Sequence, residues 1–148
     1  AILVAPLLNA SLLPGEEEVY VAGFRNAKAV LEALRSLKGL VLRPSGAPEP
    51  LLSAVVAAGF LQKRLSPDGP TTLATALLKA FPDPQEALFQ SPEGQALHKE
   101  GRTEELARAS LIGVDPVVPR LAGVRFFPKA EFGLTQDRYA QRFVAWNG

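Results

Sequence analysis

The N-terminal part of the sequence alternates short apolar runs with helical segments, and this alternation constrains the fold more than any other feature. Residues 2–5, 19–22 and 40–42 are short runs of apolar, partly β-branched residues, as in buried strands. A helix is predicted over 26–38, where apolar residues recur on one face up to a terminating glycine, and another over 50–65 after a proline. Because strand, loop and helix recur in this order, we predict an α/β fold in which a layered, mostly parallel sheet is flanked by helices.

The C-terminal half shows a different sequence pattern, because proline and glycine divide it into short segments. The predicted helices cover 71–81, 84–90, 92–100 and 103–110. Residues 117–118 and 124–127 are expected to form closing strands, and Thr135 is expected to cap a last helix. No internal repeat and no linker divides the sequence, so residues 1–148 are expected to form a single α/β domain.

Composition excludes several functional classes. The 148 residues include no cysteine, which excludes disulfides, thiolate zinc sites and a cysteine nucleophile. A net charge of +1 argues against a nucleic-acid partner, and no apolar stretch approaches the roughly 18 residues of a membrane span. Without a secretory signal pattern, a cytoplasmic protein is expected. The excess of arginine over lysine and the absence of cysteine and methionine are consistent with a heat-adapted source.

Three loops are expected to open at the carboxyl edge of the predicted sheet, where open α/β sheets bind their ligands. Helix N-termini and arginine side chains attract oxyanions, so the loops together predict an anion site. The candidate ligands are Asn9, Ser11, Arg25, Asn26, Arg43, Ser45 and Gly46. The alternative is structural: Asn26 only caps a helix, Ser45 and Gly46 only form a turn, and the two arginines are solvated. The carboxylate among these loops is Glu49, the candidate metal ligand.

An aromatic stripe lies near the C-terminus. Tyr139, Phe143 and Trp146 would share one face of the predicted last helix, with Arg138 and Arg142 beside them. Three interpretations stay open: the stripe packs on the chain's own core, pairs with a second subunit, or forms a basic aromatic surface for nucleic acid or membrane. The first is favoured. The third lacks a further basic cluster, so neither nucleic acid nor membrane is expected as a partner.

Several short motifs occur in the order found in a known family. The densest covers 80–88, followed by Ser91, Gly94, Leu97, Gly101 and the ranges 104–106 and 118–119; upstream lie Gly-Phe-Arg-Asn-Ala at 23–27 and Ala-Gly at 58–59. With these motifs the chain resembles the C-terminal half of the 2-phosphosulfolactate phosphatases, also called ComB-like proteins. The family's Thr-Thr-Asn-Gly-Thr loop corresponds here to Leu-Leu-Asn-Ala-Ser at 7–11, and the family's N-terminal half has no counterpart.

The resemblance implies a magnesium-dependent phosphomonoesterase that releases phosphate from 2-phospho-3-sulfolactate, a step toward coenzyme M. A small phosphomonoester with several anionic groups would suit the seven candidate ligands. Two hypotheses stay open. The chain is either a phosphatase, whose site is completed by a companion chain or an N-terminal segment, or a shortened, non-catalytic member that acts as an anion-binding or assembly module. Homodimerisation is a further expectation for the aromatic stripe.

Overall fold

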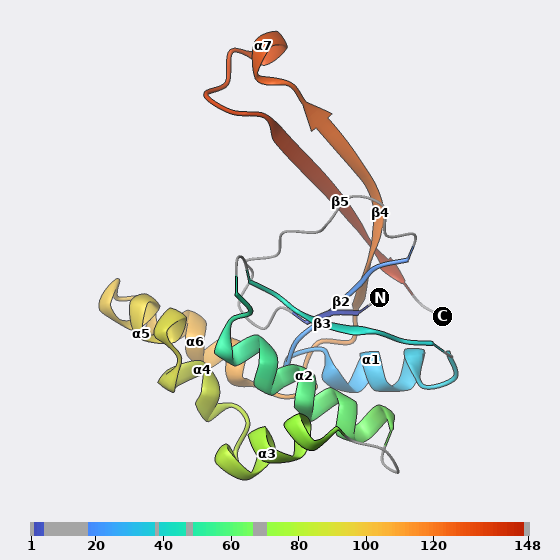
Figure 1. The fold of residues 1–148 in the computed structure, drawn as a ribbon, viewed down its shortest axis with the longest axis vertical. Coiled ribbons are helices and arrows are strands. Elements are labelled where there is room, and N and C mark those ends of the chain that lie inside the picture. The colour runs from blue at the N-terminus through green and yellow to red at the C-terminus, as the bar shows by residue number, and fades with distance from the viewer. Residues whose placement is uncertain (1, 5–17, 38, 47–48, 67–70, 147–148) are drawn as a thin grey trace.

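The computed structural model describes residues 2–4, 18–37, 39–46, 49–66 and 71–146 of the chain. Within them it contains seven helices and five strands (Figure 1). In chain order these are β1 (Ile2–Val4), β2 (Tyr20–Ala22), α1 (Ala27–Leu34), β3 (Leu42–Pro44), α2 (Leu52–Leu65), α3 (Thr72–Ala80), α4 (Glu86–Gln90), α5 (Pro92–Lys99), α6 (Thr103–Ser110), β4 (Val118–Phe127), α7 (Lys129–Phe132) and β5 (Arg138–Trp146).

The five strands form one mixed sheet in the order β3-β1-β2-β4-β5. β1 pairs in parallel with β2 and β3, as the strand and helix alternation predicts. β4 is antiparallel to both β2 and β5, so the prediction of a mostly parallel sheet is wrong. The reason lies in the connections: β4 and β5 are joined by a short segment that contains only α7, and such a link can join only antiparallel neighbours.

The hydrophobic core lies between the sheet and the helices packed on it. α1 turns Val30 and Leu34 inward, and both side chains are fully buried. From α2, Phe60 packs edge to face on Phe24, with ring centroids 5.6 Å apart. Leu88 and Leu106 attach α4 and α6 to the same cluster. Because this cluster includes residues from β1, β2, α1, α2, α4, α6 and β4, these elements pack around one core.

The short helices form where the sequence predicts them. α3 begins after Thr71, whose Oγ1 accepts a hydrogen bond from the Ala74 N–H at 3.2 Å. α5 begins after Ser91, whose Oγ accepts from the Gly94 N–H at 3.1 Å. These caps satisfy backbone donors that have no partner inside a helix, so they fix where each helix begins.

The predicted C-terminal helix is wrong, because residues 138–146 form strand β5. Side chains alternate between the faces of a strand, so Tyr139 and Phe143 face one way and Trp146 faces the other. Trp146 packs on Tyr20 of its own chain, with ring centroids 5.0 Å apart, whereas Tyr139 is 61% exposed. The three aromatic residues therefore do not share one face: Trp146 contributes to the core, and Tyr139 lies on the surface.

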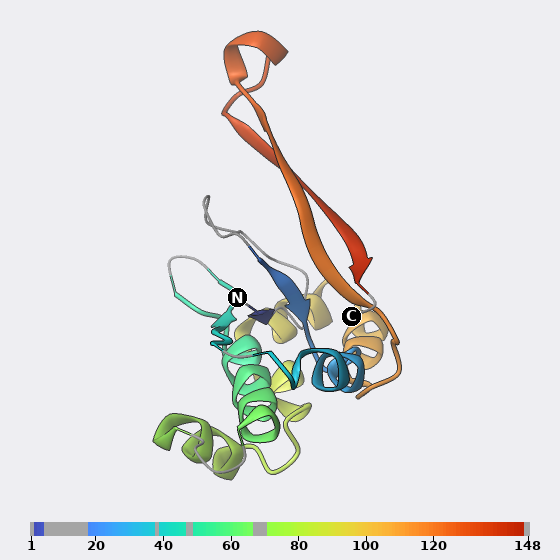
Figure 2. The ribbon, with the colours of Figure 1, turned by 90° about the vertical axis from the view of Figure 1, so that its right-hand side faces the viewer.

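β4, α7 and β5 form an arm, residues 118–146, that extends far beyond the helices in both views (Figures 1 and 2). Its base is anchored in the body: Val118 is buried, and Trp146 packs against the core. Phe127 and Phe132 stack edge to face where the chain turns at the tip.

None of the helices in the described ranges is long and apolar enough to cross a membrane.

Candidate functional site

The turn between β2 and α1 is held by the side chain of Asn26. Its Oδ1 accepts a hydrogen bond from the Gly23 N–H at 2.9 Å. Its Nδ2 donates to the carbonyl oxygens of Val21 at 3.0 Å and Val117 at 3.1 Å. Asn26 stands at the N-cap position of α1, but its side chain makes no capping bond. The buried amide thus joins β2 to the segment that leads into β4, 91 residues away.

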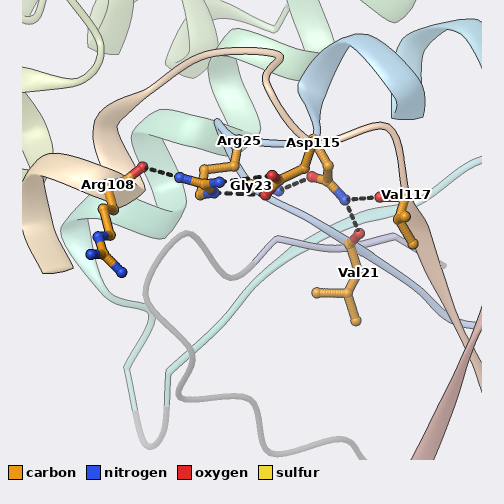
Figure 3. A network of polar contacts seen from close by, with 7 residues as sticks. Val21, Gly23, Arg25, Arg108, Asp115 and Val117 are labelled. Atoms are coloured by element: carbon orange, nitrogen blue, oxygen red, sulfur yellow. Dashed lines mark hydrogen bonds and ion pairs between the residues drawn. The ribbon is translucent and has the colours of Figure 1, made fainter.

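Arg25, the other candidate of this turn, pairs with Asp115 (Figure 3). Its Nε and Nη2 donate to the two carboxylate oxygens at 2.6 and 2.7 Å, and its Nη1 donates to the Arg108 carbonyl at 2.9 Å. The Arg25 carbonyl also accepts from the Asp115 N–H at 2.9 Å. The hydrogen bonds to Arg25, partly opposed by desolvation, hold the pKa of the Asp115 carboxyl below its usual range.

Both side chains of this turn are thereby engaged with the chain itself. The bidentate geometry of Arg25 with Asp115 is the arrangement in which arginine binds carboxylate most specifically. An incoming anion would have to compete with that carboxylate. The turn between β2 and α1 therefore fixes the segment that connects α6 to β4.

The turn between β3 and α2 holds the other described candidates. Ser45 is 3% exposed, and no hydrogen-bond partner of its Oγ exists within the described residues. Its backbone N–H donates to the Val4 carbonyl at 2.9 Å, and its carbonyl accepts from the Leu51 N–H at 2.8 Å. Gly46 has a φ of +130°, and a Cβ there would collide with the backbone of Glu49. The tight turn therefore requires glycine and places a buried hydroxyl just before α2.

The N-terminus of α2 binds a carboxylate that the sequence did not reveal. Glu93 of α5 accepts through Oε1 from the Ser53 N–H at 3.0 Å and from the Ser53 Oγ at 2.5 Å. Ser53 is fully buried in the first turn of this 14-residue helix. Free N–H groups and the helix dipole favour negative charge at such a position. The contact therefore shows that this end of α2 holds an anionic group.

The remaining candidates are placed as follows. Arg43 lies half-buried on β3, and Glu49 is exposed in the segment before α2. Asn9 and Ser11 lie outside the described residues. In the described ranges no three His, Cys, Asp or Glu side chains are grouped so that they could hold a metal ion. Glu93, whose carboxylate is bound to the Ser53 hydroxyl, does not by itself provide the oxygen ligands of a magnesium site.

Two hollows in the described part lie beside helices and are lined by none of these candidates. One, of about 620 Å³, is bordered by α2, α3 and the residues around β3, and it is largely apolar. The other, of about 680 Å³, lies against α1 near Phe60 and Arg64. Neither hollow includes the polar turn before α2.

Comparison with known proteins decides the family. A family model described as 2-phosphosulpholactate phosphatase matches residues 9–123. The chain belongs to this family. The family match includes both turns described above and ends at Gly123 within β4, so the outer half of the arm and all of β5 lie beyond it. No curated protein matches the sequence.

Proposed function

We propose that this member of the 2-phosphosulpholactate phosphatase family binds a small anionic phosphomonoester at the N-terminus of α2 and hydrolyses it. The observation that carries the proposal is the Glu93 carboxylate bound to Ser53, because it marks this end of α2 as a place for an anion. The second support is the buried Oγ of Ser45 in the turn before α2, which has no hydrogen-bond partner in the part of the chain that the structure describes. Family membership supports the class of substrate.

The chemistry suits a phosphoryl group. A phosphate accepts hydrogen bonds from hydroxyls and backbone N–H groups. The Ser45 Oγ has no partner within the described residues, and the N–H and Oγ of Ser53 would bind a phosphate that displaces the Glu93 carboxylate. A buried hydroxyl without a partner destabilises the fold, and a ligand that accepts its hydrogen bond removes this cost. Glu93 is the group able to take a proton from an attacking water or return one to the leaving alcohol. Hydrolysis then yields one alcohol and inorganic phosphate.

Magnesium is implied by the family alone, and no step is assigned to it. A companion chain or a further segment would supply the remaining groups of the site.

A second candidate function is an anion-binding or assembly module without turnover. It is favoured by the hydrogen bonds that commit Arg25 and Asn26 to the chain's own structure. In this case the turn between β3 and α2 would bind anions, and Arg25 and Asn26 would serve only to hold the segment that leads into β4.

The test is phosphate release from 2-phosphosulpholactate and a panel of phosphomonoesters, with magnesium and with EDTA, alongside calorimetric titration with inorganic phosphate. Ser45→Ala should weaken phosphate binding about 10- to 100-fold, the loss expected for a hydrogen bond to a charged group. Ser36→Ala, the same change at an exposed site after α1, is the matched control and should bind normally.

The outcomes separate the candidates. Turnover that Ser45→Ala reduces supports the phosphatase. Phosphate binding without turnover supports the module. Absence of both from the folded chain, or equal binding by the two variants, contradicts the proposed site.

A further inference from the structure

The arm has two chemically different faces. Pairing of β4 with β5 places directly opposed residues on the same side of the hairpin, with successive residues on alternate sides. One face carries no charged residue and is called the charge-free face. It consists of Pro119, Leu121, Val124, Phe126, Tyr139, Gln141, Phe143 and Ala145.

Ring contacts confirm the division. Phe126 and Tyr139 stack on the charge-free face, with centroids 5.0 Å apart. On the opposite face Arg125 lies over the Phe127 ring at 4.9 Å, next to Arg138, which pairs with Phe127. The charge-free face continues without interruption because a bulge at Ala122 shifts the register of β4 by one residue.

The charge-free face is exposed along its outer part. Val124 is 52% and Phe126 is 48% exposed, although β-branched and aromatic side chains in such a row normally gain stability by burial. A strand of ten residues spans about 30 Å, so the face is much longer than one side-chain pocket. We infer that this face docks on a second copy of the chain, each arm lying along the base of the other.

The area of the contact favours a second copy. A fully exposed aromatic side chain offers about 200 Å². Phe126 and Tyr139 are about half exposed, and the other members of the face are smaller or more buried. The eight residues together therefore offer on the order of 500 Å². One such contact buries about 1,000 Å² over both partners, below the roughly 1,200–2,000 Å² of stable specific interfaces. A two-fold copy makes the contact twice and reaches about 2,000 Å².

The body supplies a matching surface at the base of the arm. The segment from Leu111 to Val117 exposes Leu111, Ile112, Val114 and Val117, each 40–50%. It ends where the arm begins, so two antiparallel arms would place each tip at the partner's 111–117 segment. A contact in which the same two surfaces meet twice is the arrangement that a two-fold axis produces.

Charge is complementary between the arm and the helical region that precedes the 111–117 segment. The arm, 118–146, carries five basic and two acidic residues. Residues 83–115, which include α4 to α6 and most of the receiving segment, carry seven acidic and three basic ones. An arm of net +3 approaching a region of net −4 is attracted and oriented before the apolar surfaces meet.

The test measures the mass of the full chain in solution by sedimentation velocity between about 0.1 and 100 µM, which covers the micromolar end of the affinities that interfaces of this size reach. A dimer is expected. Val124→Asp, which buries a charge in the interface, should raise the dissociation constant more than about 30-fold. Ala140→Asp, exposed on the opposite face and paired with Arg125, is the matched control and should remain dimeric. Circular dichroism shows whether both variants are folded.

Cross-linking tests the antiparallel arrangement without altering the charge-free face, and the absence of native cysteine makes it specific. Leu134→Cys, near the tip, mixed with Val117→Cys, at the base, should give a disulfide-linked pair under mild oxidation. Leu134→Cys mixed with Leu73→Cys, which is exposed on α3, should not. A chain that stays monomeric throughout, a Val124→Asp variant that stays dimeric, or equal cross-linking of the two pairs would overturn the inference.

Discussion

Replacing Asn26 by alanine removes a side chain that makes three hydrogen bonds in a buried position. Each such bond contributes about 1 kcal/mol net, and the Gly23 N–H and two carbonyl oxygens would be left without their partner. We therefore expect Asn26→Ala to lower the free energy of unfolding by about 3 kcal/mol. For a chain of this size that corresponds to a fall in Tm of about 6–12 °C.

The decisive comparison is Asn26→Asp. If Asn26 acted as a helix cap, aspartate would replace it at almost no cost, because the two residues cap equally well. In the structure, however, the amide donates to Val21 and Val117, so a carboxylate would face two carbonyl oxygens and repel them. Asn26→Asp should thus be at least as destabilised as Asn26→Ala.

Urea denaturation followed by the fluorescence of Trp146, the single tryptophan, measures both variants at the base of the arm. With a slope of about 2 kcal/mol/M, the midpoint should fall by about 1.5 M. An Asn26→Asp midpoint equal to that of the wild type would refute the reasoning and restore the capping role.

Three further predictions concern neighbouring elements. Glu93→Ala should lower the free energy of unfolding by about 2 kcal/mol, because it leaves the N–H and Oγ of Ser53 without their acceptor. Glu93→Gln should lower it by about 0.3–1 kcal/mol, and urea titration compares the two variants. Gly94→Ala should lower Tm although alanine favours helices, since its Cβ would collide with the Leu88 carbonyl oxygen; a higher Tm would contradict this packing. The depressed pKa of Asp115 stabilises the fold above the usual carboxyl pKa of 3.8, and this stability is lost as pH falls through the lower folded value. Asp115→Asn should therefore show a weaker loss of stability than the wild type in acid titrations below about pH 4.

The fold was predictable where local signals and tertiary contacts agree. Serine, threonine, proline and glycine at the ends of α3 and α5 satisfy or replace backbone donors locally, so the sequence places these helices well. β5 has the opposite character: alanine, glutamine and arginine favour helices, and Tyr139, Phe143 and Trp146 recur at helical spacing. Pairing with β4 over nine positions outweighs these preferences, and such pairing is absent from any local window.

The turns that carry the candidate ligands were predictable from the sequence, but the contacts of those ligands were not. Glycine and serine after β3 correctly indicated a tight turn before a helix, and Gly46 does require its positive φ. Arg25 is separated from Asp115 by 90 residues, and Ser53 from Glu93 by 40. No spacing rule connects residues so distant, so sequence patterns could identify an arginine at a loop but not the carboxylate that occupies it.

Because of the bulge at Ala122, the charge-free face cannot be recognised from the sequence pattern of β4. Read as an unbroken strand, β4 would place Leu121 and Arg125 on the same face, and neither face of the hairpin would be free of charge. With Ala122 unpaired, Leu121 still faces the same side as Phe143, but Arg125 turns to the side of Ala140, away from Tyr139. The exposed apolar row on which dimerisation is proposed therefore exists only in this register, because a shift of one residue would place a guanidinium in its centre.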